Sequence, residues 1–261
     1  MDKDCYHVLT GGPDEAMKIL NERYDMIFFT GSTSVGKFIH QAAAKHLTHT
    51  VLELGGKSPV YLDDSVSSME IAVKRILWGK FLNTGQTCIA PDYILCTSSV
   101  AEKFIEHSKK ILKTFFEDNP KNSDSFGRII NRKNFDRLAK LLKETNGKVV
   151  IGGDLDAETN YISPTIVTNV DSSDSLMSEE LFGPILPIIT VDSVDEAVTF
   201  INKGEKPLTF YIFSNKKSVV NKLVDETSSG SILVNDVLLQ MCRKSIIFIV
   251  YIFFNIIFFI F

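Results

Sequence analysis

Short apolar runs alternate with helical patterns in the N-terminal part of the chain. Runs typical of strands lie at 8–10, 26–29 and 50–54, and patterns typical of helices lie between them at 14–23 and 35–45. Strands and helices that alternate in this way form parallel sheets with right-handed crossovers. The pattern therefore predicts a β-α-β-α-β segment, which amounts to half of a Rossmann-like sheet.

The pattern stays of the α/β type over the rest of the chain. Extended apolar segments are predicted at 59–63, 93–96, 148–153, 161–166 and 210–213. Helices are predicted at 66–82, 100–116, 134–144, 193–202 and 218–226. The helix over 100–116 is amphipathic, so one of its faces is expected to pack in the core. The residues on that face are Phe104, Ile105, Ile111, Leu112 and Phe115.

The pattern changes abruptly near the C-terminus. Residues 246–261 are apolar apart from Tyr251 and Asn255, and they follow the basic pair Arg243-Lys244. A helix over this tail would be roughly 24 Å long, short of the roughly 30 Å hydrocarbon core of a bilayer. Three interpretations stay open: a membrane anchor, a buried core element, and an aberrant C-terminus from a translated intron or a frameshift. The interpretation as an aberrant C-terminus is based on the residues after Lys244, most of which have AT-rich codons.

Composition and charge exclude several classes of protein. The 261 residues, of which 44% are hydrophobic and 23% charged, suffice for one large or two modest globular domains. The net charge is −4 and the 28 basic residues form no stripe, so we expect no nucleic-acid partner. The four cysteines and five histidines lack metal-ligand spacing, so we expect no metal site. Without a CxxC pair or a signal peptide, the sequence predicts a reducing compartment.

The sequence FLNTGQTCIAP at 81–91 places Cys88 on a short turn between a helix and a strand. A thiolate there can act as a nucleophile if amides, a cation or a base favour its charge. Gly85 lets the backbone approach a substrate, and the N–H groups of Gln86 and Thr87 adjoin the sulfur in sequence and can hold developing negative charge. The alternative interpretation is a buried structural thiol.

A second motif, VLELGGKSP at 51–59, puts Glu53 between leucines at the end of a strand. Apolar surroundings raise the pKa of a carboxyl group and make it a general base for a thiol or a water. The alternative is a salt-bridged or edge-exposed glutamate. A third motif, FFTGSTSVGK at 28–37, leads from a strand through a glycine-containing turn into a helix, whose N-terminal amides can face a phosphate.

A fourth motif, SEELFGP at 178–184, contains Glu180 and Phe182. A carboxylate can accept both hydroxyls of a vicinal diol, and a phenyl face can pack on a flat ring. The alternative interpretation is an acidic helix cap and a core phenylalanine.

The motifs FTGS, GSTxxG, LELGGKSP, GQTCIAP and EELFGP, in this order, resemble those of the NAD(P)-dependent aldehyde dehydrogenases. The likeness runs from about Val8 to about Val237 and has the character of the class 3 branch, which includes fatty aldehyde dehydrogenase. It implies the α/β fold of that family: a partial Rossmann-like parallel sheet at 1–54, the C-terminal half of the cofactor domain, then an α/β catalytic domain at 55–240. A hydrophobic tail would occupy 241–261.

The resemblance also implies a reaction, the oxidation of an aldehyde to a carboxylic acid with NAD or NADP. Cys88 would add to the carbonyl, transfer of hydride to the nicotinamide would leave a thioester, and Glu53 would activate the water that hydrolyses it. Glu180 would bind the nicotinamide ribose and Phe182 the nicotinamide ring. The residues implied to bind the cofactor are Gly31, Ser32, Thr33, Gly36, Leu54, Glu180 and Phe182.

Against the family, the chain is expected to be truncated at both ends. The oxyanion-hole asparagine and a ribose-binding lysine would lie upstream of Met1, and a dimerising strand would lie beyond Val237. The alternative to an enzyme is therefore a catalytically inactive family member, tethered to a membrane or not, that acts only by binding or subunit pairing. A weaker alternative is an acyl transferase in which coenzyme A replaces water.

The resemblance also implies partners and a location. The expected partners are a small aldehyde and a second copy of the chain, in a family-type homodimer weakened by the truncation. The expected location is the cytoplasm, with membrane contact of the endoplasmic reticulum type through 246–261 if the tail is an anchor.

Overall fold

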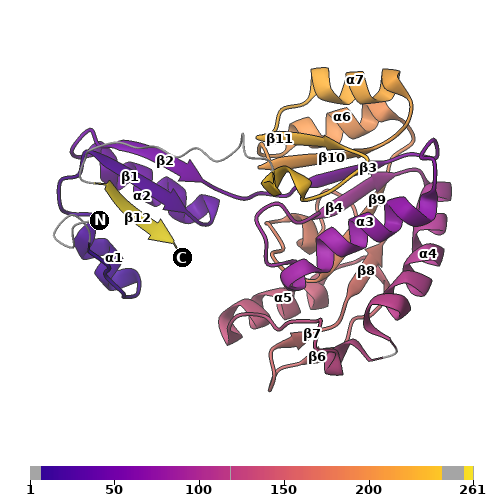
Figure 1. The fold of residues 1–261 in the computed structure, drawn as a ribbon, viewed down its shortest axis with the longest axis horizontal. Helices are drawn as coiled ribbons and strands as arrows, with labels where there is room; N and C mark the ends of the chain where they lie inside the picture. Colours follow the sequence, from indigo (N-terminus) through magenta and orange to yellow (C-terminus); the bar gives the residue numbers. More distant parts are fainter. Residues whose placement is uncertain (1–6, 118, 243–255, 261) are drawn as a thin grey trace. The chain divides into compact units, whose positions relative to one another are not determined.

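The computed structural model describes residues 7–117, 119–242 and 256–260 of the chain (Figure 1). Contacts divide the chain into two compact units. The first holds the residues up to Leu54 together with strand β12 (Ile256–Ile260), and the second begins at Gly55 and contains the remaining described helices and strands.

The first unit is a small parallel sheet with two helices. Its sheet has the order β12-β1-β2, with every described pair parallel. Its elements are α1 (Pro13–Ile19), β1 (Met26–Thr30), α2 (Thr33–Ala44) and β2 (His49–Glu53), with β12. Its core is small: the fully buried hydrophobic residues are Leu20, Ile27, Phe29, Ile39 and Ala43.

The expected strand at 8–10 is wrong. These residues are irregular, and the side chains of Val8 and Leu9 are 81% and 70% exposed. A strand needs a neighbour for its backbone N–H and C=O groups. β2 pairs with one edge of β1 and β12 with the other, so β1 has no edge left for 8–10.

The second unit is built on a seven-stranded sheet of order β11-β10-β3-β4-β9-β8-β5. All neighbours in it are parallel except β5 and β8, which are antiparallel. Its strands are β3 (Pro59–Leu62), β4 (Tyr93–Cys96), β5 (Lys148–Ile151), β8 (Thr165–Thr168), β9 (Ile185–Thr190), β10 (Thr209–Phe213) and β11 (Ser231–Val234). The short strands β6 (Leu155–Asp156) and β7 (Tyr161–Ile162) form a separate antiparallel pair.

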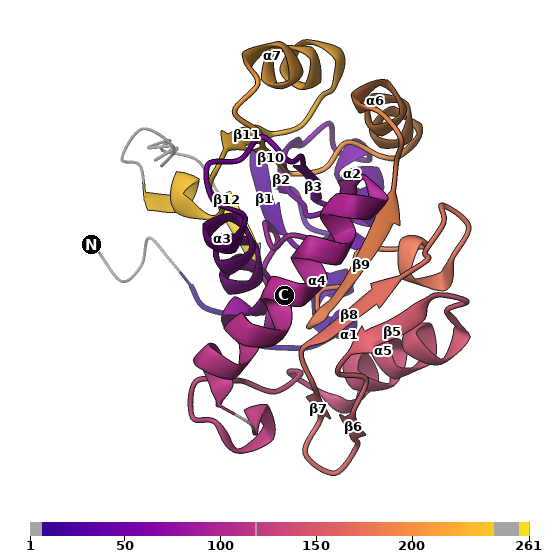
Figure 2. The same ribbon diagram turned by 90° about the vertical axis from the view of Figure 1, so that its right-hand side faces the viewer.

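Helices cover both faces of this sheet (Figure 2). Helices α3 and α4 pack on one face, and α5, α6 and α7 pack on the other. The helices are α3 (Met69–Phe81), α4 (Ser98–Phe116), α5 (Arg132–Glu144), α6 (Val194–Lys203) and α7 (Lys217–Glu226). Each lies within a few residues of its predicted range, so the predicted α/β architecture of this part is confirmed.

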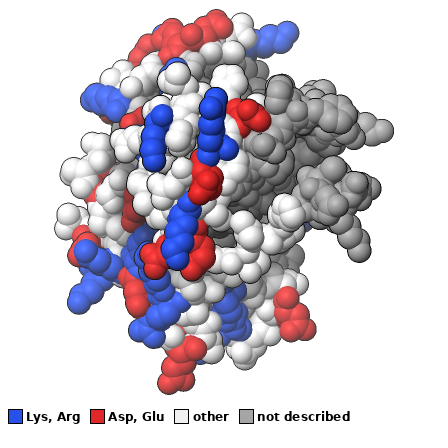
Figure 3. Space-filling view, turned by 90° about the vertical axis from the view of Figure 1, so that its left-hand side faces the viewer, with Lys and Arg blue, Asp and Glu red and all other residues white. Residues whose placement is uncertain are grey.

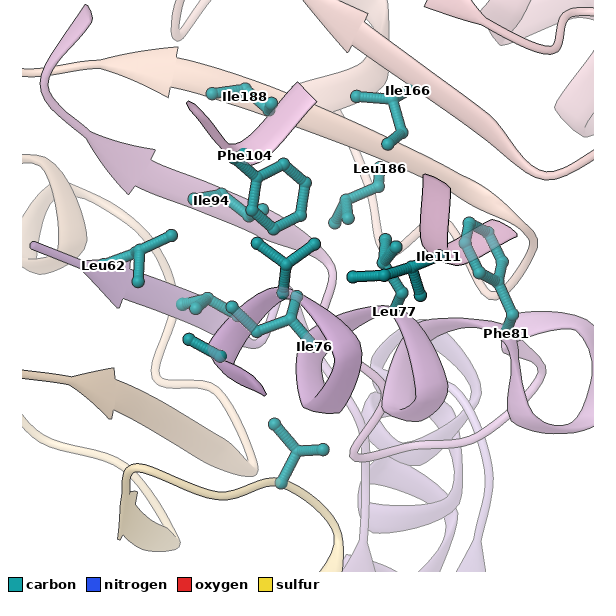
Figure 4. Close-up of a cluster of buried hydrophobic side chains, with 14 of the residues drawn as sticks. Leu62, Ile76, Leu77, Phe81, Ile94, Phe104, Ile111, Ile166, Leu186 and Ile188 are labelled. Atoms are coloured by element: carbon teal, nitrogen blue, oxygen red, sulfur yellow. The ribbon is translucent and has the colours of Figure 1, made fainter. Parts of the chain in front are cut away.

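The core of the second unit follows the two-residue period of its strands. In β3, Val60 and Leu62 belong to the cluster beneath α3 and α4, whereas Tyr61 belongs to the cluster on the opposite face. Figure 4 shows the first cluster, in which Leu62 and other strand residues meet side chains of α3 and α4, among them Phe104. Phe104 is fully buried, so the core-facing side of its helix was placed correctly from the sequence.

The apolar tail is described only in part. Residues 243–255 and 261 lie outside the described residues, and with them most of the predicted membrane anchor. The described part, Ile256–Ile260, is a strand paired with β1 rather than a helix. In the described portion of the chain, no helix is both long and apolar enough to span a bilayer.

Charged side chains of both signs are interleaved on the face shown in Figure 3, where blue and red groups alternate. Exposed ion pairs of the chain include Lys110 with Glu106 at 2.8 Å and Arg132 with Asp136 at 2.7 Å. Exposed pairs of this kind contribute at most about 1 kcal/mol each to stability.

Candidate active site

Cys88 lies on a tight turn that follows helix α3. The chain leaves the helix through Asn83, Thr84 and Gly85, all three with positive φ angles. The Ala90 N–H then donates to the Thr87 carbonyl at 2.9 Å, which closes a turn around the cysteine. The Cys88 side chain is exposed, so the alternative of a buried structural thiol does not hold for this residue.

The Gln86 side chain holds this turn against a neighbouring segment. Its amide nitrogen donates to the carbonyl of Arg128 at 3.0 Å, and its amide oxygen accepts from the N–H of Ile130 at 2.9 Å. In return, Asn83 donates to the Gln86 carbonyl at 3.0 Å. Only the backbone N–H of Gln86 was predicted to act at the site, because the distant partners of its side chain leave no local pattern in the sequence.

The other end of the turn rests on the central sheet. The hydroxyl of Tyr211, which is fully buried in β10, donates to the Ile89 carbonyl at 2.6 Å. A buried carbonyl without such a donor would cost about 1–3 kcal/mol. The hydrogen bond from the buried Tyr211 therefore fixes the position of Ile89, the residue after Cys88.

The loop 179–183 lies against the Cys88 turn. Gly85 has φ +77°, and a Cβ at this position would overlap the carbonyl of Gly183. Arg137 binds the loop from α5, donating to the Leu181 carbonyl at 2.6 Å and to the Glu180 carbonyl at 3.3 Å. Turn and loop are thus in direct backbone contact, so the structure brings the motifs of Cys88 and Glu180 together within the second unit.

The Glu180 side chain points back onto the glycine pair at 55–56. Its carboxylate packs so closely on Gly55 that a Cβ there would overlap it. Burial raises the pKa of the Glu180 carboxyl to about 7, and the nearby Asp92 adds to the rise. A hydrogen bond from the Gly56 backbone opposes this rise in pKa. Phe182, two residues on, is 40% exposed with φ +50°, so it is not the core phenylalanine of the alternative interpretation.

An ion pair at the base of the site joins two of the sequence motifs to the stretch that follows the Cys88 turn. Lys57, next to the glycine pair, lies 2.5 Å from the Asp92 carboxylate and also donates to the Glu179 carbonyl at 2.9 Å. Asp92 in turn accepts from the Leu181 N–H at 3.1 Å. Lys80 of α3 is completely buried, 3.9 Å from the same carboxylate. None of these roles was predicted, because a single lysine or aspartate gives no periodic signal.

The first unit contains the other predicted residues. Ser32 caps helix α2, accepting from the Val35 N–H at 3.4 Å, so Thr33 opens the helix. The first-turn amides of a helix have no intrahelical acceptor. Gly36 packs against Leu54, since a Cβ there would lie 2.7 Å from the Leu54 Cδ2. The predicted strand–turn–helix geometry is therefore present.

Glu53 ends strand β2, and its carbonyl accepts from the Gly31 N–H at 3.1 Å. Its side chain is exposed. Gly31 and Glu53 thus lie together at the carboxyl end of neighbouring strands in the first unit. Cys88, Glu180 and Phe182 belong to the second unit.

Both groups carry chemistry that suits a dinucleotide and a carbonyl substrate. Helix N-terminal amides bind phosphate, and a carboxylate binds ribose hydroxyls. An exposed thiol on a rigid turn can add to an electrophilic carbon. Within the described residues, no group of three His, Cys, Asp or Glu is arranged to hold a metal ion.

Comparison with known proteins gives a consistent result. The model of the aldehyde dehydrogenase family matches residues 1–246. A mouse protein named "Aldehyde dehydrogenase, dimeric NADP-preferring" is 49% identical over 241 residues, which cover 92% of this chain and 52% of that protein. Mouse "Aldehyde dehydrogenase family 3 member A2" is 47% identical over 248 residues, covering 95% and 51%. The chain thus spans about half the length of the curated relatives that it matches.

Solved structures agree with the sequence relatives. A substrate-bound state of AldH from Staphylococcus aureus superposes with a TM-score of 0.87 at 41% identity, covering 90% of this chain and 51% of that one. A 3,6-anhydro-L-galactose dehydrogenase in complex with NAP superposes with a TM-score of 0.80 at 28% identity, covering 88% and 50%.

Proposed function

We propose, from the premise that this chain belongs to the aldehyde dehydrogenase family and is similar to its family 3 members, that it oxidises an aldehyde to a carboxylic acid with NAD or NADP. The observation that carries the proposal is the exposed Cys88 on a turn held by Gln86 and Tyr211, in contact with the Glu180 loop.

The residues of the chain suggest how the reaction proceeds. The Cys88 thiolate adds to the aldehyde carbon and forms a thiohemiacetal, whose hydride leaves so that a thioester remains on the sulfur. A bound nicotinamide supplies the acceptor for that hydride. Glu53 takes a proton from the water that hydrolyses the thioester, which releases the acid and restores the thiol.

Each unit by itself supplies candidate contacts for the cofactor. In this proposal, the first turn of α2 behind Ser32, with Thr33, Gly31 and Gly36 at its start, faces the pyrophosphate. Leu54 packs behind that turn, against Gly36. Glu180 would accept hydrogen bonds from the ribose hydroxyls and Phe182 would pack on the nicotinamide ring, roles that their carboxylate and exposed phenyl ring suit.

A turnover assay of the full chain tests the proposal. NADH or NADPH formation is followed with a medium-chain or an aromatic aldehyde, with and without coenzyme A. We expect Cys88→Ser to lower turnover by about 10³-fold or more, because the nucleophile is lost. Cys96→Ala, which changes a buried thiol of β4, is the matched control and should keep turnover.

Absence of turnover in the unmutated chain would contradict the proposal. It would favour the alternative, a member of the family that acts only by binding or by pairing with another subunit. Product formation that requires coenzyme A would instead indicate an acyl transferase.

The role of Glu53 is tested separately by Glu53→Gln. A hydrolytic base acts after the first hydride transfer, so the variant should give an initial burst of NADH followed by a slow steady rate. Equal loss in the burst and in the steady rate would show that Glu53 is not the base for hydrolysis.

We also propose pairing of two copies, since the name of a mouse relative describes that protein as dimeric. Light scattering of the purified chain gives the mass directly, and a monomer at all concentrations would contradict the pairing. The membrane contact predicted for 246–261 stays a prediction, because residues 246–255 and 261 lie outside the described residues and only Ile256–Ile260 is described, as a strand paired with β1.

A further inference from the structure

We propose that Asp92 is a positioning residue, which holds the loop 179–183, and with it Glu180 and Phe182, in place beside the Cys88 turn, with Lys57 and Lys80 as its counter-charges. The role of Glu180 and Phe182 in binding the cofactor rests on the proposed function. The mechanical link between Asp92 and the loop does not, and it can be measured without turnover.

The carboxylate of Asp92 connects the two segments directly. Asp92 lies four residues after Cys88, in the stretch that leads from the turn into β4. One of its oxygens accepts the buried Leu181 N–H at 3.1 Å, and the other lies 2.5 Å from Lys57. Leu181 stands between Glu180 and Phe182, so this single hydrogen bond fixes the middle of the loop.

Lys57 strengthens the same connection from a third segment. Its ammonium group donates to the carbonyls of Leu176 at 2.8 Å and Glu179 at 2.9 Å, in addition to pairing with Asp92. Because Lys57 follows the glycine pair on which the Glu180 carboxylate packs, one ammonium group ties that pair, the loop and Asp92 together. Hydrogen bonds to charged groups are worth about twice those between neutral groups.

Lys80 is the unusual member of the cluster. Its side chain is 0% exposed, and its ammonium nitrogen has no hydrogen-bond acceptor among the described residues, although Asp92 lies 3.9 Å away. A buried ammonium group is costly unless a charge compensates it. Asp92, at 4% exposure, is the carboxylate within ion-pair distance, so Lys80 and Asp92 depend on each other.

Hydrogen exchange of the full chain, resolved to single amides by mass spectrometry, tests the link to the loop. Asp92→Ala removes the acceptor, so the Leu181 amide should exchange about tenfold faster or more, relative to amides of β4. Asp92→Asn keeps one acceptor oxygen and should give a smaller increase. Asp64→Asn, which breaks the exposed pair with Lys216, is the control and should leave Leu181 unchanged.

Unchanged exchange of Leu181 relative to β4 in Asp92→Ala would overturn the proposal. If Asp92→Ala fails to fold, Asp92→Asn takes its place: an unchanged ratio of Leu181 exchange to β4 exchange in that variant would overturn the proposal.

Thermal melts test the counter-charge. Asp92→Asn leaves Lys80 buried beside a neutral amide, so adding Lys80→Met should raise the melting temperature above that of Asp92→Asn alone. A double variant that melts lower than Asp92→Asn would show that Lys80 is not a counter-charge of Asp92.

Kinetics separate positioning from a merely structural role. In Asp92→Asn, KM for the nicotinamide dinucleotide should rise by about fivefold or more while KM for the aldehyde changes less than about twofold. Equal changes in both constants would contradict positioning of the cofactor loop. If the unmutated chain shows no turnover, the proposed function fails, and the exchange experiment still decides the role of Asp92.

Discussion

At the scale of single residues, Glu180 is the most perturbed carboxyl group of the candidate site. Burial raises its pKa from 4.5 to about 7, with a further contribution from Asp92, against the opposing effects of Gly56, Lys57 and Lys80. The folded chain therefore holds a proton on this carboxyl at pH values where the unfolded chain has lost it. The contribution of Glu180 to the free energy of unfolding is fully present at low pH, and it is lost as the pH rises from about 4.5 towards 7.

Glu180→Gln removes that titration while preserving the shape of the side chain. We expect the unmutated chain to lose about 1–3 kcal/mol relative to Glu180→Gln between about pH 5 and pH 8. Thermal or urea unfolding across this range measures the difference. Glu102→Gln, an exposed glutamate of α4, is the matched control. Parallel curves for the unmutated chain and Glu180→Gln would contradict a raised pKa.

The roles of single residues were proposed from their motifs. The turn that carries Cys88 and the strand–turn–helix that contains Ser32 match the predicted local structure, and the roles of both residues stay predictions. The supporting residues were not found. Gln86 contacts Arg128, 42 positions away, and Asp92 contacts Leu181, 89 positions away, and such contacts leave no spacing or periodicity in the sequence.

At the scale of elements, the turn between α3 and β4 depends on a side-chain tether. The amide of Gln86 bridges the turn to Arg128 and Ile130, in the segment that leads into α5. The turn contains three consecutive residues of positive φ, an arrangement that costs energy and persists only when its surroundings hold it.

Gln86→Ala should therefore loosen the turn without unfolding the sheet. We expect a loss of about 1–3 kcal/mol in stability, because the Ile130 N–H and the Arg128 carbonyl lose their partners. Site-resolved alkylation should also show a changed rate at Cys88, while the exchange of β4 amides stays the same. Gln240→Ala, which removes an amide near Tyr211 but not the tether, is the comparison. An unaltered alkylation rate at Cys88 would argue against the tether.

Helices were more predictable than strands. The amphipathic period of α4 predicted both its range and its buried face, because apolar residues recur every three or four positions along the buried face of a helix. Strand β9 was not predicted, although it lies between β4 and β8 at the centre of the sheet. It contains Pro187, which lacks an N–H and usually indicates an edge or a break. The run at 8–10 had the right residues for a strand and no partner.

At the scale of the whole molecule, the first unit is built from two ends of the chain. Its sheet needs β12, whose five residues pair in register with all of β1. The sequence offered three interpretations of this apolar tail, and the pattern alone did not favour a strand. Pairing between residues more than 220 positions apart has no local signature.

Removing residues 243–261 should affect the two units differently. Without β12, the outer edge of β1 loses its partner strand, so amides at 26–30 should exchange about tenfold faster or more. Amides of β4 and β9 in the second unit should keep their protection. Phe258→Pro, which removes one backbone N–H of β12 without shortening the chain, should act in the same direction. Equal loss of protection in both units would contradict their independence.

The place of β12 also sets an order of events during synthesis. Every strand of the large sheet has been made once Val234 has emerged from the ribosome, so that unit can form while translation continues. In the small sheet, the edge of β1 that pairs with β12 stays open until Ile260 has emerged from the ribosome. A nascent chain stalled at residue 255 would carry a finished large unit and an open small one, and during that interval the bare edge of β1 is where a chaperone or a neighbouring nascent chain would bind.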